Sequence, residues 1–168
     1  DVYKRQPYTG MIISTRETQS SREKVLELGV SQISGGSNTA VGGYDEADRS
    51  EEDTAQFDVS DHRTLDQVIA WLIDLGYVPS FCTACYRLGR TGDRFMSLVK
   101  TGQIANCCAP NALMTLKEYL VDYASPQTRL KGEAMIAREM AKVPNEKVRT
   151  KATENLAAIE RGERDFRF

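Results

Sequence analysis

The 168-residue sequence lacks the features of several common protein classes. It has no apolar run that approaches the length of a membrane span, and its first residues lack the apolar segment of a secretory signal peptide. It also lacks an excess of basic charge, because its net charge is -2. Without a positive field there is no general attraction to DNA, RNA or anionic lipid. We therefore expect a cytoplasmic protein with no nucleic-acid partner and no membrane partner.

Histidine and cysteine are scarce as well. The only histidine, His62, lies just before a predicted surface helix, and we interpret it mainly as a solvated side chain. The four cysteines are not accompanied by a secretory signal. In a reducing compartment, such cysteines are more often metal ligands or catalytic thiols than disulfides.

Three of the cysteines, Cys82, Cys85 and Cys108, form the pattern C-x2-C-x22-C. Two thiolates separated by two residues can bind one metal centre from a tight turn, and a third from a distant segment completes a cage. Three protein ligands leave one coordination position free. Structural zinc sites rarely tolerate a free position, whereas catalytic metals and site-differentiated iron-sulfur clusters use one.

Two alternatives to an iron-sulfur cluster remain open. A zinc-binding interaction module could use all four thiols, those of Cys82, Cys85, Cys107 and Cys108. Adjacent cysteines usually point apart, so we expect the Cys107 thiol to face away if Cys108 is a ligand. A redox protein of the thioredoxin type would need only the C-x2-C pair and would leave Cys108 unexplained. Nearby arginines would suit a negatively charged cluster, or could form a solvated basic loop: Arg87, Arg90 and Arg94.

The first part of the sequence predicts a parallel strand-helix-strand unit. Residues 10–14 and 30–34 are short strand-like runs, and between them Ser20 or Ser21 caps a helix that ends at Gly29. Connections this short are usual for such a unit. Functional groups of parallel units lie beyond the carboxyl ends of the strands.

These strand ends carry candidate binding residues. Arg16 could bind an amino-acid carboxylate through a forked contact, although a surface arginine that caps a loop is the alternative. Ser14, Ser34 and Gly35 are candidates for cofactor binding because small residues let a ligand approach the backbone. Such residues also simply terminate strands.

The rest of the sequence predicts an acidic loop followed by helices. Thr64 and Gln67 form a capping box for a helix that ends at Gly76. Further helices are predicted to begin at Thr91, at Asn111 and at Ser125-Pro126.

The run of residues 81–96, the pair Cys107 and Cys108, and residues 110–120 resemble the C-terminal region of a known family. This is the HydG family, the radical S-adenosylmethionine (SAM) tyrosine lyases that mature iron-iron hydrogenase. Residues 13–17 and 30–37 are similar to the last two strands of that family's (β/α)8 barrel. A related lyase, the thiazole-pathway 2-iminoacetate synthase, shares the barrel and the biotin and thiamin synthesis associated domain but lacks this cysteine arrangement.

The resemblance implies an α/β fold in which the last two strands of a (β/α)8 radical SAM barrel precede a mainly helical, cluster-binding domain. It divides the chain into a non-native leader, a barrel unit, an acidic loop, an auxiliary-cluster domain and a peripheral charged helix. These segments comprise residues 1–6, 7–44, 45–63, 64–143 and 144–168, respectively.

The resemblance also implies an activity. In this family tyrosine is split into p-cresol and a glycine-derived fragment, which an auxiliary 4Fe-4S cluster with an extra iron converts to carbon monoxide and cyanide. Cys82, Cys85 and Cys108 match the ligands of that cluster. The implied small-molecule partners are tyrosine and SAM, other hydrogenase maturases act downstream, and the organism is an anaerobe.

The sequence departs from the family in one respect, because it contains no C-x3-C-x2-C motif. In the family that motif binds a second 4Fe-4S cluster, which cleaves SAM. We therefore interpret the chain as the C-terminal part of a longer enzyme. We predict that the chain alone cleaves neither SAM nor tyrosine.

Overall fold

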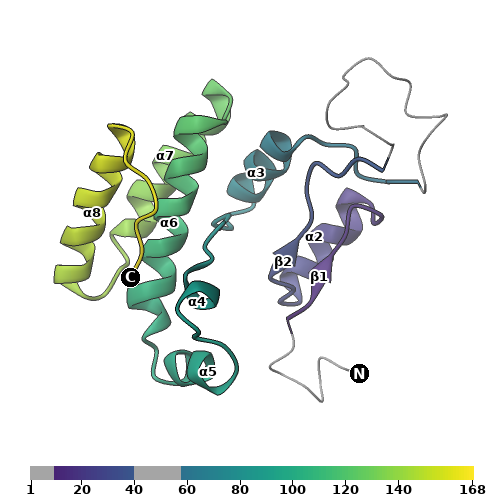
Figure 1. Ribbon diagram of the computed structural model, residues 1–168. Coiled ribbons are helices and arrows are strands. Elements are labelled where there is room, and N and C mark those ends of the chain that lie inside the picture. The colour runs from purple at the N-terminus through teal and green to yellow at the C-terminus, as the bar shows by residue number, and fades with distance from the viewer. Residues whose placement is uncertain (1–9, 40–57) are drawn as a thin grey trace. The chain divides into compact units, whose positions relative to one another are not determined.

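The computed structural model describes residues 10–39 and 58–168. The predicted leader and most of the predicted acidic loop lie outside these residues. The chain divides into two compact units, Asp1–Val68 and Ile69–Phe168 (Figure 1). As described, it is mainly helical with a small two-stranded sheet.

The first unit contains the predicted strand-helix-strand motif. Strand β1 (Ile12–Ile13) and strand β2 (Gln32–Ile33) pair in parallel, and helix α2 (Gln19–Glu27) connects them (Figure 1). The register places Ile13 opposite Ile33. The strands are shorter than the two predicted runs, and their membership of a (β/α)8 barrel stays a prediction.

Helix α2 begins two or three residues earlier than predicted. Thr18 is the N-cap, and its hydroxyl accepts a hydrogen bond from the Ser21 backbone N–H at 3.3 Å. The predicted caps, Ser20 and Ser21, lie inside the helix, because the extended backbone that a cap requires occurs at Thr18. The predicted end is confirmed, since Gly29 adopts a left-handed φ of +97°.

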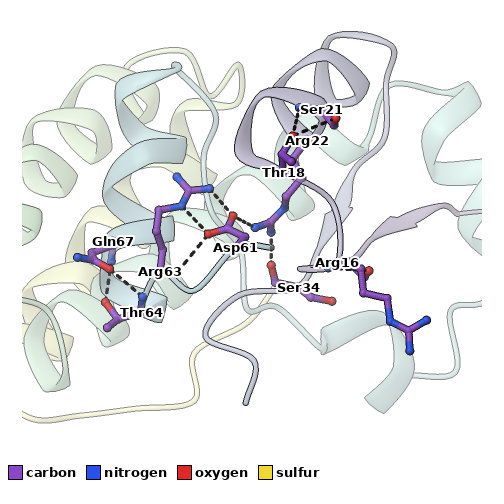
Figure 2. Close-up of polar contacts among 10 residues, drawn as sticks. Arg16, Thr18, Ser21, Arg22, Ser34, Asp61, Arg63, Thr64 and Gln67 are labelled. Carbon is purple, nitrogen blue, oxygen red and sulfur yellow. Dashed lines mark hydrogen bonds and ion pairs between the residues drawn. The ribbon is translucent and has the colours of Figure 1, made fainter. Parts of the chain in front are cut away.

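Helix α3 (Leu65–Asp74) confirms the predicted capping box. The Thr64 N–H donates to Gln67 Oε1 at 2.8 Å, and the Gln67 N–H donates to the Thr64 hydroxyl at 3.3 Å (Figure 2). These reciprocal bonds satisfy two N–H groups at the start of the helix. Gly76, with φ of +87°, ends the helical turn as predicted.

The second unit is a helical bundle built on α6 (Ile104–Asp122). This helix packs against α7 (Pro126–Met140) and α8 (Glu146–Glu160) (Figure 1). The side chains of Ser125 and Asn145 cap the two outer helices, so the start predicted at Ser125-Pro126 is confirmed. Although α8 is rich in charge, it buries Ala152 and Ile159 completely.

Two short helices, α4 (Ala84–Arg87) and α5 (Asp93–Lys100), precede α6. The predicted start of α6 at Asn111 is wrong, because the helix begins at Ile104 and includes Cys107 and Cys108. Proline usually favours a helix start, because it lacks the N–H that a helix interior uses. In the structure Pro110 is accommodated inside the helix, with its side chain buried.

Candidate functional site

The first two cysteines of the motif lie in a tight turn. Cys82 precedes α4, and its Sγ accepts a hydrogen bond from the Ala84 N–H at 3.5 Å. Cys85 lies within α4, which is only four residues long. Gly89, with φ of +62°, then lets the chain leave the helix. We call residues 82–90 the cysteine turn.

The other two cysteines lie near the start of α6. The Cys107 and Cys108 Sγ atoms are 3.8 Å apart. The expectation that the Cys107 thiol faces away when Cys108 binds a metal concerns the metal-bound site and stays a prediction. Successive helix residues differ by about 100° in direction, but side-chain rotation brings these two sulfur atoms together. All four cysteines are free and half-buried.

The electrostatics of Cys108 connect the two cysteine segments. Burial raises the pKa of its thiol to about 12, and the neighbouring Cys107, Cys85 and Cys82 add to the shift. Coulomb interactions in a protein extend over several ångströms. Cys82, Cys85 and Cys107 therefore lie within electrostatic range of Cys108. Within residues 10–39 and 58–168, however, no three Cys, His, Asp or Glu side chains are already gathered around one point. We conclude that the thiols are near one another without forming a closed cage.

The donor set nevertheless fits an iron-sulfur cluster. Soft thiolates are the usual protein ligands of such clusters, and N–H groups around the sulfur atoms tune them. The Arg90 Nε is buried and has no hydrogen-bond partner in the described structure, so its N–H is available as a donor. Its backbone N–H donates to the Cys85 carbonyl at 2.8 Å, which places Arg90 directly after the cysteine turn's helix.

Of the three nearby arginines, Arg87 and Arg94 are exposed and Arg90 is half-buried, so the solvated-loop alternative stays open for the first two. Arg87 forms a forked ion pair with Asp165, and Arg90 Nη2 donates to the Phe168 carbonyl at 2.9 Å. Only Arg94 is confined to local contacts, since its Nη1 donates weakly to the Gly89 carbonyl at 3.4 Å.

The candidates at the strand ends lie in the first unit. Ser14 and Ser34 follow paired strands, and the Ser34 N–H donates to the Ile13 carbonyl at 3.0 Å. The Ser14 hydroxyl accepts a hydrogen bond from the Arg16 N–H at 3.2 Å. The Arg16 side chain is exposed and points away from the neighbouring ion network (Figure 2). Parallel pairing thus brings these residues to one edge of the sheet.

Gly35 has a packing role. A Cβ atom at this position would lie 3.3 Å from both Leu65 Cδ1 and Val68 Cγ1. The glycine therefore allows the chain after β2 to approach the start of α3 closely. Binding of a ligand by Gly35 stays a prediction. His62, which we interpreted mainly as solvated, is exposed.

A buried ion network beside β2 was missed by the sequence analysis. Arg22 on α2 is fully buried, and its guanidinium donates both to Asp61 and to the Ser34 carbonyl (Figure 2). Arg63 also donates to Asp61, with Nε 2.8 Å from Oδ1. The sequence does contain one indication that Arg22 is buried. Arg22 precedes the buried Leu26 by four residues and therefore lies on the same helix face.

The pKa values of both Asp61 and Arg22 are lowered, which favours the charged form of the carboxylate and disfavours that of the guanidinium. The hydrogen bond from Arg63 lowers the pKa of Asp61 to about 2 against the opposing effect of burial, and the charge of Arg22 contributes. Burial lowers the pKa of Arg22 despite the attraction of Asp61. A guanidinium stays protonated at all accessible pH values. The pair is therefore ionised, and Asp61 compensates the charge that burial of Arg22 takes out of water.

No helix in the described part of the chain combines the length and apolarity needed to cross a membrane. Comparison with known proteins gives a family match, similarity to solved structures and one negative result. Residues 5–78 match the Biotin and Thiamin Synthesis associated domain family. A search of curated proteins gave no significant match.

One similar solved structure is described as "Crystal structure of HydG: A maturase of the FeFe-hydrogenase". It is 50% identical to this chain and superposes with a TM-score of 0.88 over 99% of it. The chain spans 36% of the length of that protein. By this likeness across nearly its whole length, the chain belongs to the HydG family and corresponds to the family's C-terminal part.

Proposed function

We propose that this chain is the C-terminal part of a radical SAM tyrosine lyase that acts in assembly of the hydrogenase active-site cofactor. The observation that carries this proposal is the 50% identity to a HydG structure over 99% of the chain. The complete enzyme would be a carbon-carbon lyase that uses tyrosine and SAM. Its SAM-cleaving 4Fe-4S cluster requires a C-x3-C-x2-C motif that this chain does not contain.

In this proposal Cys82, Cys85 and Cys108 hold the auxiliary 4Fe-4S cluster. Three thiolate ligands leave one iron without a protein ligand, and that corner supplies an attachment point for the extra iron. Two features support the assignment: Cys82, Cys85 and Cys107 lie within electrostatic range of Cys108, and Arg90, the last residue of the cysteine turn, has a buried Nε with an available N–H. The protein's own contribution is to hold three thiols and a hydrogen-bond donor around a partly desolvated space.

At the strand ends, we propose that the Arg16 guanidinium binds the carboxylate of tyrosine or SAM. Its exposed position beyond β1 supports this role, since a forked guanidinium matches a carboxylate. Ser14, Ser34 and Gly35 would line the approach to the bound molecule. The buried Arg22 holds the Ser34 carbonyl and so fixes the position of this edge.

The proposed setting is the cytoplasm of an anaerobic organism, with other hydrogenase maturases as downstream partners. We propose neither a nucleic-acid nor a membrane partner, in keeping with the net charge of -2.

The test uses the 168-residue chain purified without oxygen and reconstituted with iron and sulfide. We expect a brown, oxygen-sensitive protein with about four iron and four sulfide per chain. Incubation with tyrosine, SAM and a reductant should give no p-cresol. Colourless protein without iron would overturn the cluster proposal, and p-cresol formation would overturn the predicted inactivity.

A zinc-binding interaction module is the second candidate, and one observation favours it. The Cys107 and Cys108 sulfur atoms are 3.8 Å apart, so both could face the same metal. A four-thiolate zinc site should give one tightly bound zinc, and loss of either adjacent cysteine should release it. Metal analysis of the wild-type chain and of Cys107→Ser therefore separates the two candidates.

A further inference from the structure

The end of the chain runs back along the helix that carries Cys108. After α8, Gly162 adopts a left-handed φ of +103° and turns the chain. The following residues, yellow in Figure 1, return beside α6. We call residues 163–168 the strap.

The strap is bonded to α6 along its length and in antiparallel order. As residue numbers rise along the strap, its partners fall back along α6. Arg164 pairs with Asp122, the Asp165 N–H donates to Glu118 at 2.8 Å, and the Phe168 N–H donates to Asn111 Oδ1 at 2.9 Å. The amide of Asn111, a residue only 2% exposed, also donates to the Phe168 carbonyl at 3.3 Å. The Phe168 side chain packs against the bundle core.

The same strap residues hold the cysteine turn. The Asp165 carboxylate accepts a forked pair of bonds from Arg87, with Nη2 3.0 Å from Oδ2. Arg90 Nη2 donates to the Phe168 carbonyl. Asp165 has a left-handed φ of +70°, a conformation that aspartate tolerates better than most residues. This bend lets the backbone of Asp165 bind α6 while its side chain binds Arg87.

The cysteine turn needs such support because it is too short to be stable by itself. Its helix has four residues, far fewer than an isolated helix requires. A second anchor lies before the turn, where Phe81 stacks on Tyr119 of α6 with ring centroids 5.3 Å apart. The anchors after the turn come from the strap.

We propose that the strap positions the cysteine turn on α6, so that Cys82 and Cys85 are held opposite Cys108. Asp165 and Phe168 then act as positioning residues for a site whose ligands lie elsewhere. The inference rests on the proposed function only for the identity of the bound metal. The positions of the thiols that it predicts do not depend on that metal. It can therefore be tested with and without iron.

Asp165→Asn is the informative variant. Asparagine keeps the left-handed conformation and the backbone bond to Glu118, but it removes the charge that binds Arg87. A deletion of residues 166–168 removes the Phe168 contacts. Arg167→Ala is the matched control, because Arg167 binds the same Asp165 carboxylate at 3.0 Å from within the strap. Asp165→Glu tests rescue by a carboxylate.

The first measurement is the alkylation rate of each cysteine in the metal-free chain, followed by peptide mass spectrometry. Asp165→Asn and the deletion should raise the rates at Cys82 and Cys85 about fivefold, since local opening becomes more frequent. In these two variants the alkylation rates at Cys107 and Cys108 and the melting temperature of the bundle helices should stay near wild type. In Arg167→Ala the rates at all four cysteines should stay near wild type. Asp165→Glu should recover only part of the wild-type protection, because glutamate restores the carboxylate but tolerates the left-handed conformation less well than aspartate.

The second measurement is the iron and sulfide content after reconstitution. It should fall by about half or more in Asp165→Asn and in the deletion of residues 166–168, because the cysteine turn is then mispositioned. Unchanged alkylation at Cys82 and Cys85 in both variants would overturn the inference. An equal rise at all four cysteines would also overturn it, since that pattern indicates general unfolding. If the wild-type chain binds no iron but the alkylation pattern is as expected, the strap is supported and the proposed cluster function fails.

Discussion

Replacing Asp61 with asparagine should destabilise the strand-helix-strand unit by about 2–3 kcal/mol, because it leaves the buried Arg22 guanidinium without its counter-charge. Two lines of reasoning give this magnitude. Removing one partner of a buried ion pair costs about 3–5 kcal/mol, and asparagine retains part of the hydrogen bonding. The pKa of Asp61 is lowered from 3.8 to about 2, which corresponds to ~2.5 kcal/mol in favour of the charged form. Its side chain is 2% exposed, so solvent screening is weak.

Hydrogen exchange followed by mass spectrometry measures the effect locally. In Asp61→Asn, peptides from α2 should exchange about 30- to 150-fold faster than in wild type, whereas peptides from α6 should be unchanged. Asp58→Asn is the matched control, since Asp58 is an exposed carboxylate in the same segment. Unchanged exchange in α2 would refute the role of the network. An equal increase in α6 would show that the network does not act on the first unit alone.

Three further predictions concern acid, packing and the cysteines. Because the pKa of Asp61 is depressed to about 2, its stabilising effect should be complete above pH 3.8, its ordinary pKa, and lost as the pH falls towards 2; an acid protease should cleave the first unit increasingly over this range, with Asp61→Asn insensitive to it. Gly132→Ala should lower the unfolding free energy by about 1–2 kcal/mol, since a Cβ atom would lie 2.4 Å from Leu120 Cδ1 in the core; a thermal melt at or above the wild-type temperature would contradict this. Cys108→Ser should abolish iron binding while Cys107→Ser is mild, and the reverse pattern in metal analysis would overturn the ligand assignment.

The parts of the fold that the sequence predicts depend on contacts between near neighbours. The capping box of Thr64 and Gln67 joins residues three apart, and both its bonds form as expected. Gly29 and Gly76 end their helices in left-handed conformations that glycine adopts at little cost. The strand-helix-strand motif follows from the same local patterns and is present in parallel pairing.

The errors arise where distant contacts outweigh local preference. Pro110 normally favours a helix start, yet α6 begins six residues earlier, and Pro110 is buried within it. Arg22 and Asp61 are 39 positions apart, and no local pattern predicts their pairing.

For the candidate site, too, the sequence predicts one part and the tertiary structure decides another. The C-x2-C-x22-C spacing and its resemblance to a family specify which residues carry the chemistry, because ligand type and number are properties of the sequence itself. Only the tertiary structure decided how the two cysteine segments are held near one another. That depends on Asp165 and Phe168, which bind both the cysteine turn and α6 from the far end of the chain. Such contacts form because folding closes long loops at a cost that grows slowly with length, so partners about 80 residues apart remain accessible.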